Sequence, residues 1–497
     1  MGAVGYQSVI DQLGLRVLPL ARPAAVRAVT RLEDMRVELA VPARMAPDRD
    51  DVLKNLLFAL KHEGVNLQIL AAVCDHLEPA SLLDELRRTP TGVYIRQLCM
   101  VWENVTGRSL EDLPADLGGV IRPLFDPKKF VTTAKPIYNR RWRLQFNGLG
   151  DWQFCPWIRR SSELDTVLAE DPLGQVKAFL KEVPAEMVER ILAWAYLDET
   201  RSTYEIEGER PASNRTEAFA ALLKQATTRR ELDENYLVEL QNAAVTNPLK
   251  REPCFRGYQN YLQSGAPGSR GVTYLPPPPE MLPSLLQGMS RIANQEVASD
   301  THPLITAALV SFGFVFAHPF GDGNGRLSRY LAHYTLCQAG GLADGSILPL
   351  STAMKRNESA YLAALRTYSA PVRNLWDVRW IDGPTFEFSF KGHPSVYRYW
   401  DATACTTFFC TMALEAVRRD LRAEVEFLTC HDEVARRVND RFDVVGSDLS
   451  QLIIMVHQNN GVLSNNRRKQ FADKVQPEAL DYIESCVRTL MQRIRSA

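Results

Sequence analysis

Apolar residues recur at helical spacing along most of the chain. Leu53, Leu56 and Leu60 lie three or four residues apart, which places them on one face of a helix, and Gly64 marks a break before the next helix. Residues 175–197 and the stretch from Val396 to the end show the same periodicity. The pattern predicts a mainly α chain.

Two further helices are expected at residues 303–317 and 324–338, on either side of a short loop. The first carries a wide apolar stripe that includes Ile305, Leu309 and Phe312, which predicts a helix buried on most sides. Gly340 follows the second helix, where a left-handed terminator is favoured. The polar residues between 318 and 323 should therefore lie at a junction of two helices.

Less regular segments divide the chain. Residues 116–154 are rich in proline and glycine, residues 276–279 are four consecutive prolines, and the composition shifts toward aromatic residues and glycine near residues 380–392. A chain of 497 residues is too long for one ordinary core. We predict an N-terminal helical domain at 1–190, a central domain at 191–372 and a C-terminal helical region at 373–497.

Composition and charge narrow the function classes only a little. The chain is 45% hydrophobic and its formal net charge is −1, so no global field draws it to nucleic acid or to an anionic membrane. The nine cysteines are scattered without a Cys-x-x-Cys pair, which favours reduced thiols over disulfides or a zinc site. No signal peptide or bilayer-length apolar run is visible, so a cytoplasmic protein with no membrane partner is expected.

The chemistry is concentrated in residues 318–329, which read His-Pro-Phe-Gly-Asp-Gly-Asn-Gly-Arg-Leu-Ser-Arg. Glycines let a ligand approach the backbone, and the free N–H groups at the start of the second helix favour a phosphate. Arg326 and Arg329 can reach further phosphate oxygens, and Asp322 offers a hard oxygen to Mg²⁺. His318 can take a proton from an incoming hydroxyl.

A packing explanation is weaker for this segment than for other histidines. His302 and His393 also precede proline, but no glycines or arginines follow them, so capping or core roles are expected there. A combination of twelve such residues has a low chance of arising for packing alone.

The segment resembles the Fic motif, His-Pro-Phe-x-Asp/Glu-Gly-Asn-Gly-Arg-x-x-Arg, at every defined position. The resemblance covers roughly residues 195–370 and implies a Fic-type helical core with a small β-hairpin flap, flanked by helical regions like those beside Fic cores in some bacterial proteins. It implies transfer of AMP from Mg-ATP to a Ser, Thr or Tyr hydroxyl of a protein, on a partner or on the chain itself.

The resemblance also assigns the motif residues. It implies that His318 is the general base, Asp322 the Mg²⁺ ligand, Gly323, Asn324 and Gly325 the backbone cradle, Arg326 a phosphate ligand and Arg329 the partner of the γ-phosphate. Gly325 stands where Doc-like kinases of the family carry Lys, which favours AMP transfer over phosphorylation.

Two more segments fit the same resemblance. Residues 255–261, followed by Val272, Thr273 and Tyr274, resemble the flap hairpin, which could hold a target segment by strand addition, although an ordinary glycine-rich hairpin is an equal interpretation. Upstream, Thr203-Tyr204-Glu205-Ile206-Glu207-Gly208 matches the inhibitory pattern Ser/Thr-x-x-x-Glu-Gly/Asn. The hypothesis is that Glu207 pairs with Arg329 and leaves ATP in an unproductive pose. A solvated acidic helix end, with Gly208 as its terminator, is the rival interpretation.

Alternatives stay open at several points. The donor could be UTP or GTP, Glu207 could also serve removal of AMP, and an oligomer is compatible with the sequence. A different class of function is a DNA- or partner-binding protein regulated by the Fic core, because residues 447–471 have helix-turn-helix-like spacing with Arg467, Arg468 and Lys469 on the second helix. A row of three cations is more often a solvated helix face.

Overall fold

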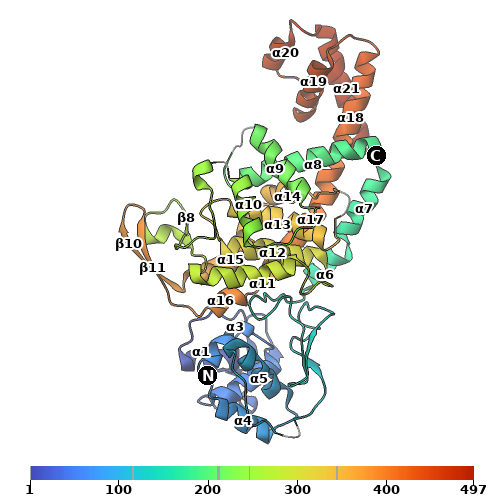
Figure 1. The fold of residues 1–497 in the computed structure, drawn as a ribbon. Helices are drawn as coiled ribbons and strands as arrows, with labels where there is room; N and C mark the ends of the chain where they lie inside the picture. Colours follow the sequence, from blue (N-terminus) through green and yellow to red (C-terminus); the bar gives the residue numbers. More distant parts are fainter. Residues whose placement is uncertain (1, 115–116, 210–212, 246, 343–344, 497) are drawn as a thin grey trace.

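The protein is mainly α-helical, as predicted. The computed structural model describes residues 2–114, 117–209, 213–245, 247–342 and 345–496. Figure 1 shows the N-terminal part at the bottom, the core in the middle and the C-terminal helices above it. None of the helices in these ranges combines the length and the apolar character that a membrane crossing requires. All nine cysteines are free.

The N-terminal part combines helices with two small sheets. The sequence predicted a helical region here, yet residues 3–42 contain a four-stranded sheet in the order β1-β2-β4-β3, with β2 parallel to β4. A second sheet has the order β5-β7-β6. The elements are β1 (Ala3–Val4), α1 (Gly5–Leu13), β2 (Ala24–Arg27), β3 (Glu33–Asp34), β4 (Leu39–Pro42), α2 (Val52–His62), α3 (Leu67–Cys74), α4 (Pro79–Arg88), α5 (Val93–Thr106), β5 (Arg122–Pro123), β6 (Ile137–Asn139) and β7 (Leu144–Phe146).

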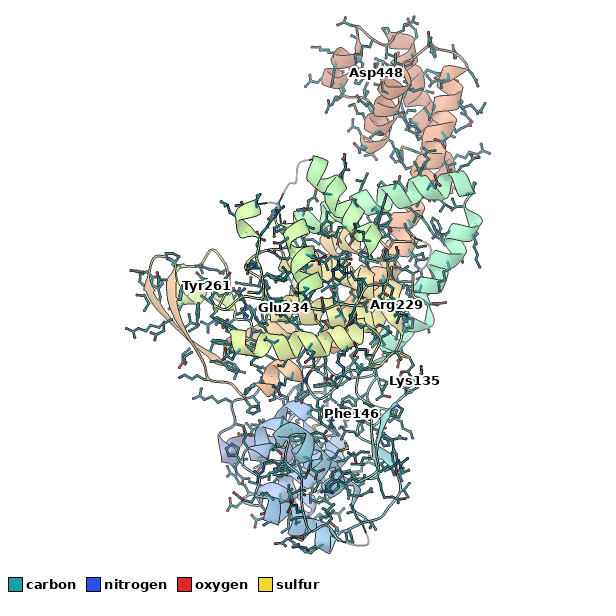
Figure 2. The ribbon with its side chains drawn as sticks, in the orientation of Figure 1. Lys135, Phe146, Arg229, Glu234, Tyr261 and Asp448 are labelled. Atoms are coloured by element: carbon teal, nitrogen blue, oxygen red, sulfur yellow. The ribbon has the colours of Figure 1, made fainter. Side chains whose placement is uncertain are left out.

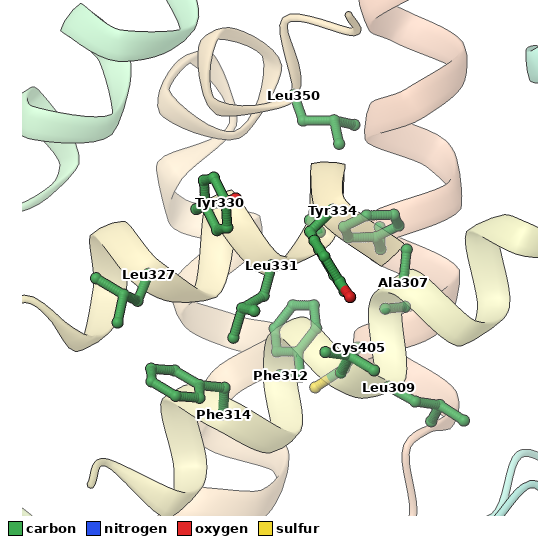
Figure 3. Close-up of a cluster of buried hydrophobic side chains, with 14 of the residues drawn as sticks. Ala307, Leu309, Phe312, Phe314, Leu327, Tyr330, Leu331, Tyr334, Leu350 and Cys405 are labelled. Carbon is green, nitrogen blue, oxygen red and sulfur yellow. The ribbon is translucent and has the colours of Figure 1, made fainter. Parts of the chain in front are cut away.

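The core is built around two central helices that the sequence predicted with these bounds. They are α12 (Pro303–Ala317), which is buried on nearly all sides, and α13 (Asn324–Gln338). Figure 3 shows side chains of both helices meeting, with Phe312 and Phe314 from α12 near Leu327 and Leu331 from α13. The surrounding helices are α6 (Ser162–Ala169), α7 (Pro172–Glu182), α8 (Ala185–Ile206), α9 (Ser213–Gln225), α10 (Glu234–Ala244), α11 (Leu282–Ala293), α14 (Leu350–Arg356), α15 (Glu358–Arg373), α16 (Ser395–Arg398) and α17 (Thr403–Glu415).

The apolar cluster of the core is larger than the central segment 191–372. It extends from Leu149 to Leu428, so residues 149–183 pack with the core although the sequence suggested an N-terminal domain up to residue 190. A second cluster, from Tyr6 to Tyr399, fills the N-terminal part, and a third, from Cys430 to Leu490, fills the C-terminal part. The predicted domain boundaries stay predictions.

Two hairpins lie side by side at one edge of the core. The first pairs β8 (Leu262–Gln263) with β9 (Val272–Tyr274), and the second pairs β10 (Trp376–Asp382) with β11 (Thr385–Phe390). Tyr261, labelled in Figure 2 beside the second hairpin, packs against Phe386 and Phe388 with ring centroids 5.2 Å apart in each case.

A continuous helical arm leads to the C-terminal part. Helix α17 passes through a π-helical segment, Ala416–Leu421, into α18 (Arg422–Asn439). Three further helices, α19 (Gly446–Gln458), α20 (Asn465–Phe471) and α21 (Pro477–Ser496), pack with α18 (Figure 1). Ser464 caps the helix that follows the turn at Asn460 and Gly461.

Candidate active site

The loop between α12 and α13 is shaped by two left-handed residues. His318 ends α12 with φ 47°, and its backbone N–H still donates to the carbonyl of Phe314 at 2.9 Å. Gly323 stands before α13 with φ 89°, a conformation that residues with a Cβ rarely adopt. Asn324 closes the loop, since its side chain accepts from the Phe320 N–H at 3.1 Å and donates to the Phe320 carbonyl at 2.7 Å.

The N-terminus of α13 is open to an anion. No side chain caps it among the described residues, so its first N–H groups keep the donors that a phosphate uses at a helix start. The carboxylate of Glu207 lies against this end, and a Cβ added at Gly325 would clash with Glu207 Oε1. The glycine therefore provides the space that the carboxylate occupies.

The His318 ring is in the neutral form, which can accept a proton. Its Nδ1 lies 3.1 Å from the Val315 carbonyl. A carbonyl can only accept, so Nδ1 carries a proton and Nε2 is left with its lone pair in the neutral ring. Burial lowers the pKa of His318 to about 4, so the imidazole is neutral at physiological pH.

Asp322 is ionised and held by two cations. Its carboxylate accepts from Lys250 Nζ at 2.7 Å and from Arg326 Nη2 at 2.7 Å. Burial opposes its ionisation, but the Lys250 hydrogen bond and the Arg326 charge outweigh burial and lower its pKa. In the described ranges no three His, Cys, Asp or Glu side chains converge as a metal site. A single carboxylate nevertheless suits Mg²⁺, which takes few protein ligands when phosphates complete its shell.

Arg326 makes more hydrogen bonds within the protein than the sequence suggested. It is 1% exposed, and besides Asp322 it donates to Glu209 Oε2 at 3.1 Å and to the Ala244 carbonyl at 3.2 Å. Its guanidinium also lies 5.2 Å from the ring centroid of Tyr204. Only Nε has no hydrogen-bond partner, so the residue joins α8, α10 and the loop and keeps one donor for a ligand.

Arg329 meets both polar residues of the upstream pattern. Its Nη2 donates to Glu207 Oε1 at 2.6 Å and to the Thr203 carbonyl at 2.9 Å, and its Nε donates to Thr203 Oγ1 at 3.1 Å. Nη1 is buried without a partner, an arrangement that leaves one donor for an incoming anion. Gly208, with φ 72°, follows the end of α8, as a helix terminator does. The ion pair between Glu207 and Arg329 is present as well, so the two interpretations are compatible.

A buried polar chain supports Thr203 from behind. Thr203 Oγ1 lies 2.7 Å from Ser351 Oγ on α14, and Ser351 Oγ donates to Glu199 Oε1 at 2.5 Å. His333 Nε2 lies 3.0 Å from the same carboxylate oxygen. All of these side chains are at most 2% exposed, which fixes α8 firmly against α13 and α14.

The predicted flap strand faces inward more than outward. Val272 and Tyr274 are each 3% exposed, and Tyr274 Oη donates to the Phe316 carbonyl at 2.7 Å. Thr273 is exposed and its Oγ1 donates to the Leu262 carbonyl at 3.1 Å. A target-docking role for these three residues stays a prediction.

Four further residues contact the loop: Lys250 and Glu252 were missed by sequence reasoning, whereas Arg256 and Asn260 lie in the segment 255–261 that was assigned to the flap. Glu252 Oε1 accepts from the Gly321 N–H at 2.7 Å, and Arg256 Nε donates to the His318 carbonyl at 2.9 Å. Asn260 Nδ2 donates to the Phe320 carbonyl at 3.1 Å, and Lys250 holds Asp322. They lie about 60 to 70 positions before the loop, and no spacing rule connects them to it.

The cations of the helix-turn-helix-like segment are not equivalent. Arg468 donates to Asp481 Oδ1 and Glu484 Oε1, both at 2.7 Å, whereas Arg467 contacts Gln470. A DNA contact stays a prediction, and it would depend on Arg467 and Lys469.

Comparisons with known proteins find matches to part of the core. Residues 231–336 match the profile of the Fic/DOC family. The chain is 45% identical over 67 residues to proteins called protein adenylyltransferase Fic from Drosophila sechellia, Drosophila simulans and Drosophila melanogaster, which is 14% of this chain and 14% of each relative. The chain therefore spans about one seventh of the length of these curated relatives.

Two solved structures also align with parts of the chain. A Fic family protein from Desulfovibrio desulfuricans aligns with a TM-score of 0.37 and 16% identity over 65% of this chain and 87% of that one. A Fic domain containing signaling protein from Bacteroides thetaiotaomicron aligns with a TM-score of 0.38 and 17% identity over 53% and 97%. On the motif and the profile match, this chain carries a domain of the Fic/DOC family.

Proposed function

We propose that the protein is an adenylyltransferase that moves AMP from ATP to a hydroxyl group of a protein, with the bond between the α- and β-phosphates broken and pyrophosphate as the leaving group. The observation that carries the proposal is the neutral His318, with a free Nε2, beside an uncapped helix start and the unbonded donor of Arg329. The 67-residue similarity to proteins called protein adenylyltransferase supports the same activity.

Each residue has a defined task in this reaction. His318 Nε2 accepts the proton of the target hydroxyl, because Nδ1 is held by Val315. The N–H groups that open α13 and the free donors of Arg326 and Arg329 bind phosphate oxygens. Asp322 would hold Mg²⁺, which when bound neutralises charge on the phosphates. Lys250 must leave Asp322 for that to occur.

Glu207 restrains the activity in this proposal. Its carboxylate occupies the space over Gly325 and takes the Arg329 Nη2 donor that a γ-phosphate would use. ATP could then bind only in a pose in which the target hydroxyl is not in line with the α-phosphorus. The same carboxylate would be placed to assist removal of AMP from a modified protein.

The test uses labelled nucleotides. Full-length protein with Glu207→Gly is incubated with Mg²⁺ and either α-labelled or γ-labelled ATP, and modification is read by intact mass and by gel. The α label is expected to enter protein, the γ label is not, and His318→Ala should abolish the signal. His76→Ala, at an exposed histidine, is the control and should leave it unchanged. Incorporation of γ label, or activity that survives His318→Ala, would reject the proposal.

A further inference from the structure

A large cavity lies between the N-terminal part and the core, away from the motif. Its volume is about 1010 Å³ and none of residues 318–329 lines it. One wall comes from the N-terminal part, around Leu18–Arg22 and Glu63–Gln68, and the other comes from α15 and α17. This volume is at the upper end of small-molecule sites, which occur preferentially where domains meet.

The core side of the cavity is a long wall of small and apolar side chains. Helices α15 and α17 run in opposite directions, since Asn357 bonds to Glu415 at one end and the Tyr368 ring lies 5.3 Å from Trp400 at the other. The lining residues of α17 extend from Thr403 to Glu415, which at 1.5 Å per residue is about 18 Å. Ala360, Ala363, Ala364, Phe408 and Met412 contribute the apolar surface.

Arg159 stands at the Thr403 end of this wall. Its backbone N–H donates to Thr403 Oγ1 at 2.9 Å. Its guanidinium lies 5.1 Å from the ring centroid of Trp157 and 5.4 Å from that of Phe130. Burial lowers its pKa, yet no carboxylate in the described residues comes within 4.0 Å of it. Arg159 is partly buried, and cations that lose part of their contact with water are normally paired.

Three other charged groups that line the cavity are paired with a neighbour or exposed to solvent. Arg22 pairs with Asp34, and Glu415 pairs with Arg356 at 3.1 Å. Glu163 is exposed to solvent.

Two carboxyls share the buried end with Arg159. Burial raises the pKa of Glu63 to about 7, and its Oε1 accepts from the Tyr6 N–H at 2.9 Å. Burial also raises the pKa of Asp401, which accepts from the Thr403 N–H at 3.0 Å. Both carboxyls attract the Arg159 guanidinium, but neither lies within 4.0 Å of it, so Arg159 has no direct ion-pair partner among the described residues.

We propose that this cavity binds an elongated amphipathic anion, with a carboxylate or phosphate head on Arg159 and an apolar body along α15 and α17. The head would supply the missing counter-charge by a charge-assisted pair with the guanidinium. The body would cover the alanine-rich wall and remove it from water. The proposal does not depend on the reaction at residues 318–329.

Calorimetric titration of the full-length protein tests it. The probes are dodecanoate, dodecyl phosphate and dodecylammonium, each kept below the concentration at which it forms micelles. We expect one saturable site for at least one anion and none for the cation, and the preferred anion identifies the head group. Arg159→Gln should weaken binding at least about tenfold, because a hydrogen-bonded charge is lost. Arg160→Gln, at the exposed neighbour, should leave it unchanged.

A second variant keeps the test decisive if Arg159→Gln does not fold. Ala363 lines the cavity and is exposed to it, so Ala363→Phe should fill the apolar end without disturbing the core. Loss of anion binding in folded Ala363→Phe protein supports the proposal. Equal binding to every folded variant indicates adsorption to the surface and overturns it, as does tighter binding of dodecylammonium.

Discussion

Replacing Glu207 by Gly is expected to raise AMP incorporation. The change removes the carboxylate that takes Arg329 Nη2 at 2.6 Å and empties the space above Gly325. Arg329 keeps its two bonds to Thr203, so its guanidinium stays in place for a γ-phosphate.

The expected increase in AMP incorporation can be worked out from the ion pair between Glu207 and Arg329 that the change removes. A hydrogen bond with a charged partner contributes about 1.5–3 kcal/mol. The Arg329 side chain is 3% exposed but that of Glu207 is 35% exposed, so solvent weakens the pair and the lower half of this range applies. If productive ATP must displace the carboxylate, about 1.5–2 kcal/mol corresponds to a rise of about 10- to 30-fold in rate at limiting ATP.

The assay compares initial rates of labelling from α-labelled ATP for wild type, Glu207→Gly and Glu205→Gly. Glu205 is exposed on the same helix turn, so its replacement introduces the same glycine without removing the pair. A rise in Glu207→Gly alone is the expected result. Equal rates in all three proteins, or an equal rise in both variants, would refute a blocking role for the carboxylate.

Other predictions concern the same loop. Gly325→Ala should destabilise wild type by about 1–2 kcal/mol, because the new methyl group displaces the Glu207 carboxylate, and this loss should vanish in the Glu207→Gly background in a chemical denaturation cycle. The His318 resonance, assigned by NMR with His318→Ala, should not titrate between pH 5 and 8, since its pKa is about 4; a midpoint near 6.5 would contradict this. Because the unfolded imidazole has the higher pKa, this group's protonation should reduce stability as pH falls from 6.5 to 4. Lys250→Met should lower the Mg²⁺ concentration for half-maximal labelling by about two- to fivefold, because Asp322 loses a competing exposed partner; an unchanged Mg²⁺ requirement would count against Asp322 as the ligand.

The helices of the core could be read from the sequence because their signals are local. The bounds 303–317 and 324–338 are fixed by apolar periodicity, by proline at one start and by glycines at the loop. The strands of residues 1–45 could not, since strands of two to four residues are too short to show an alternation.

The candidate site, too, could be predicted from the sequence only in part. The motif residues lie within twelve positions, and the structure places them in one loop and the first two turns of α13. Lys250 and Glu252 reach that loop only through tertiary packing, and nothing in their own neighbourhood distinguishes them from other surface charges. The expectation that Arg326 is chiefly a ligand residue overlooked how many of its donors the protein itself uses.

The helical arm has a mechanical consequence. Helix α18 continues α17 through a π-helical segment, a kind of irregularity that often occurs at functional positions, and it touches α8 through Asp432 and Arg190 at 2.6 Å. Over the 18 residues of α18, about 27 Å, a tilt of 10° moves the far end by about 5 Å. A load applied to the C-terminal helices would therefore act as a torque on α8, whose last residue, Ile206, directly precedes Glu207.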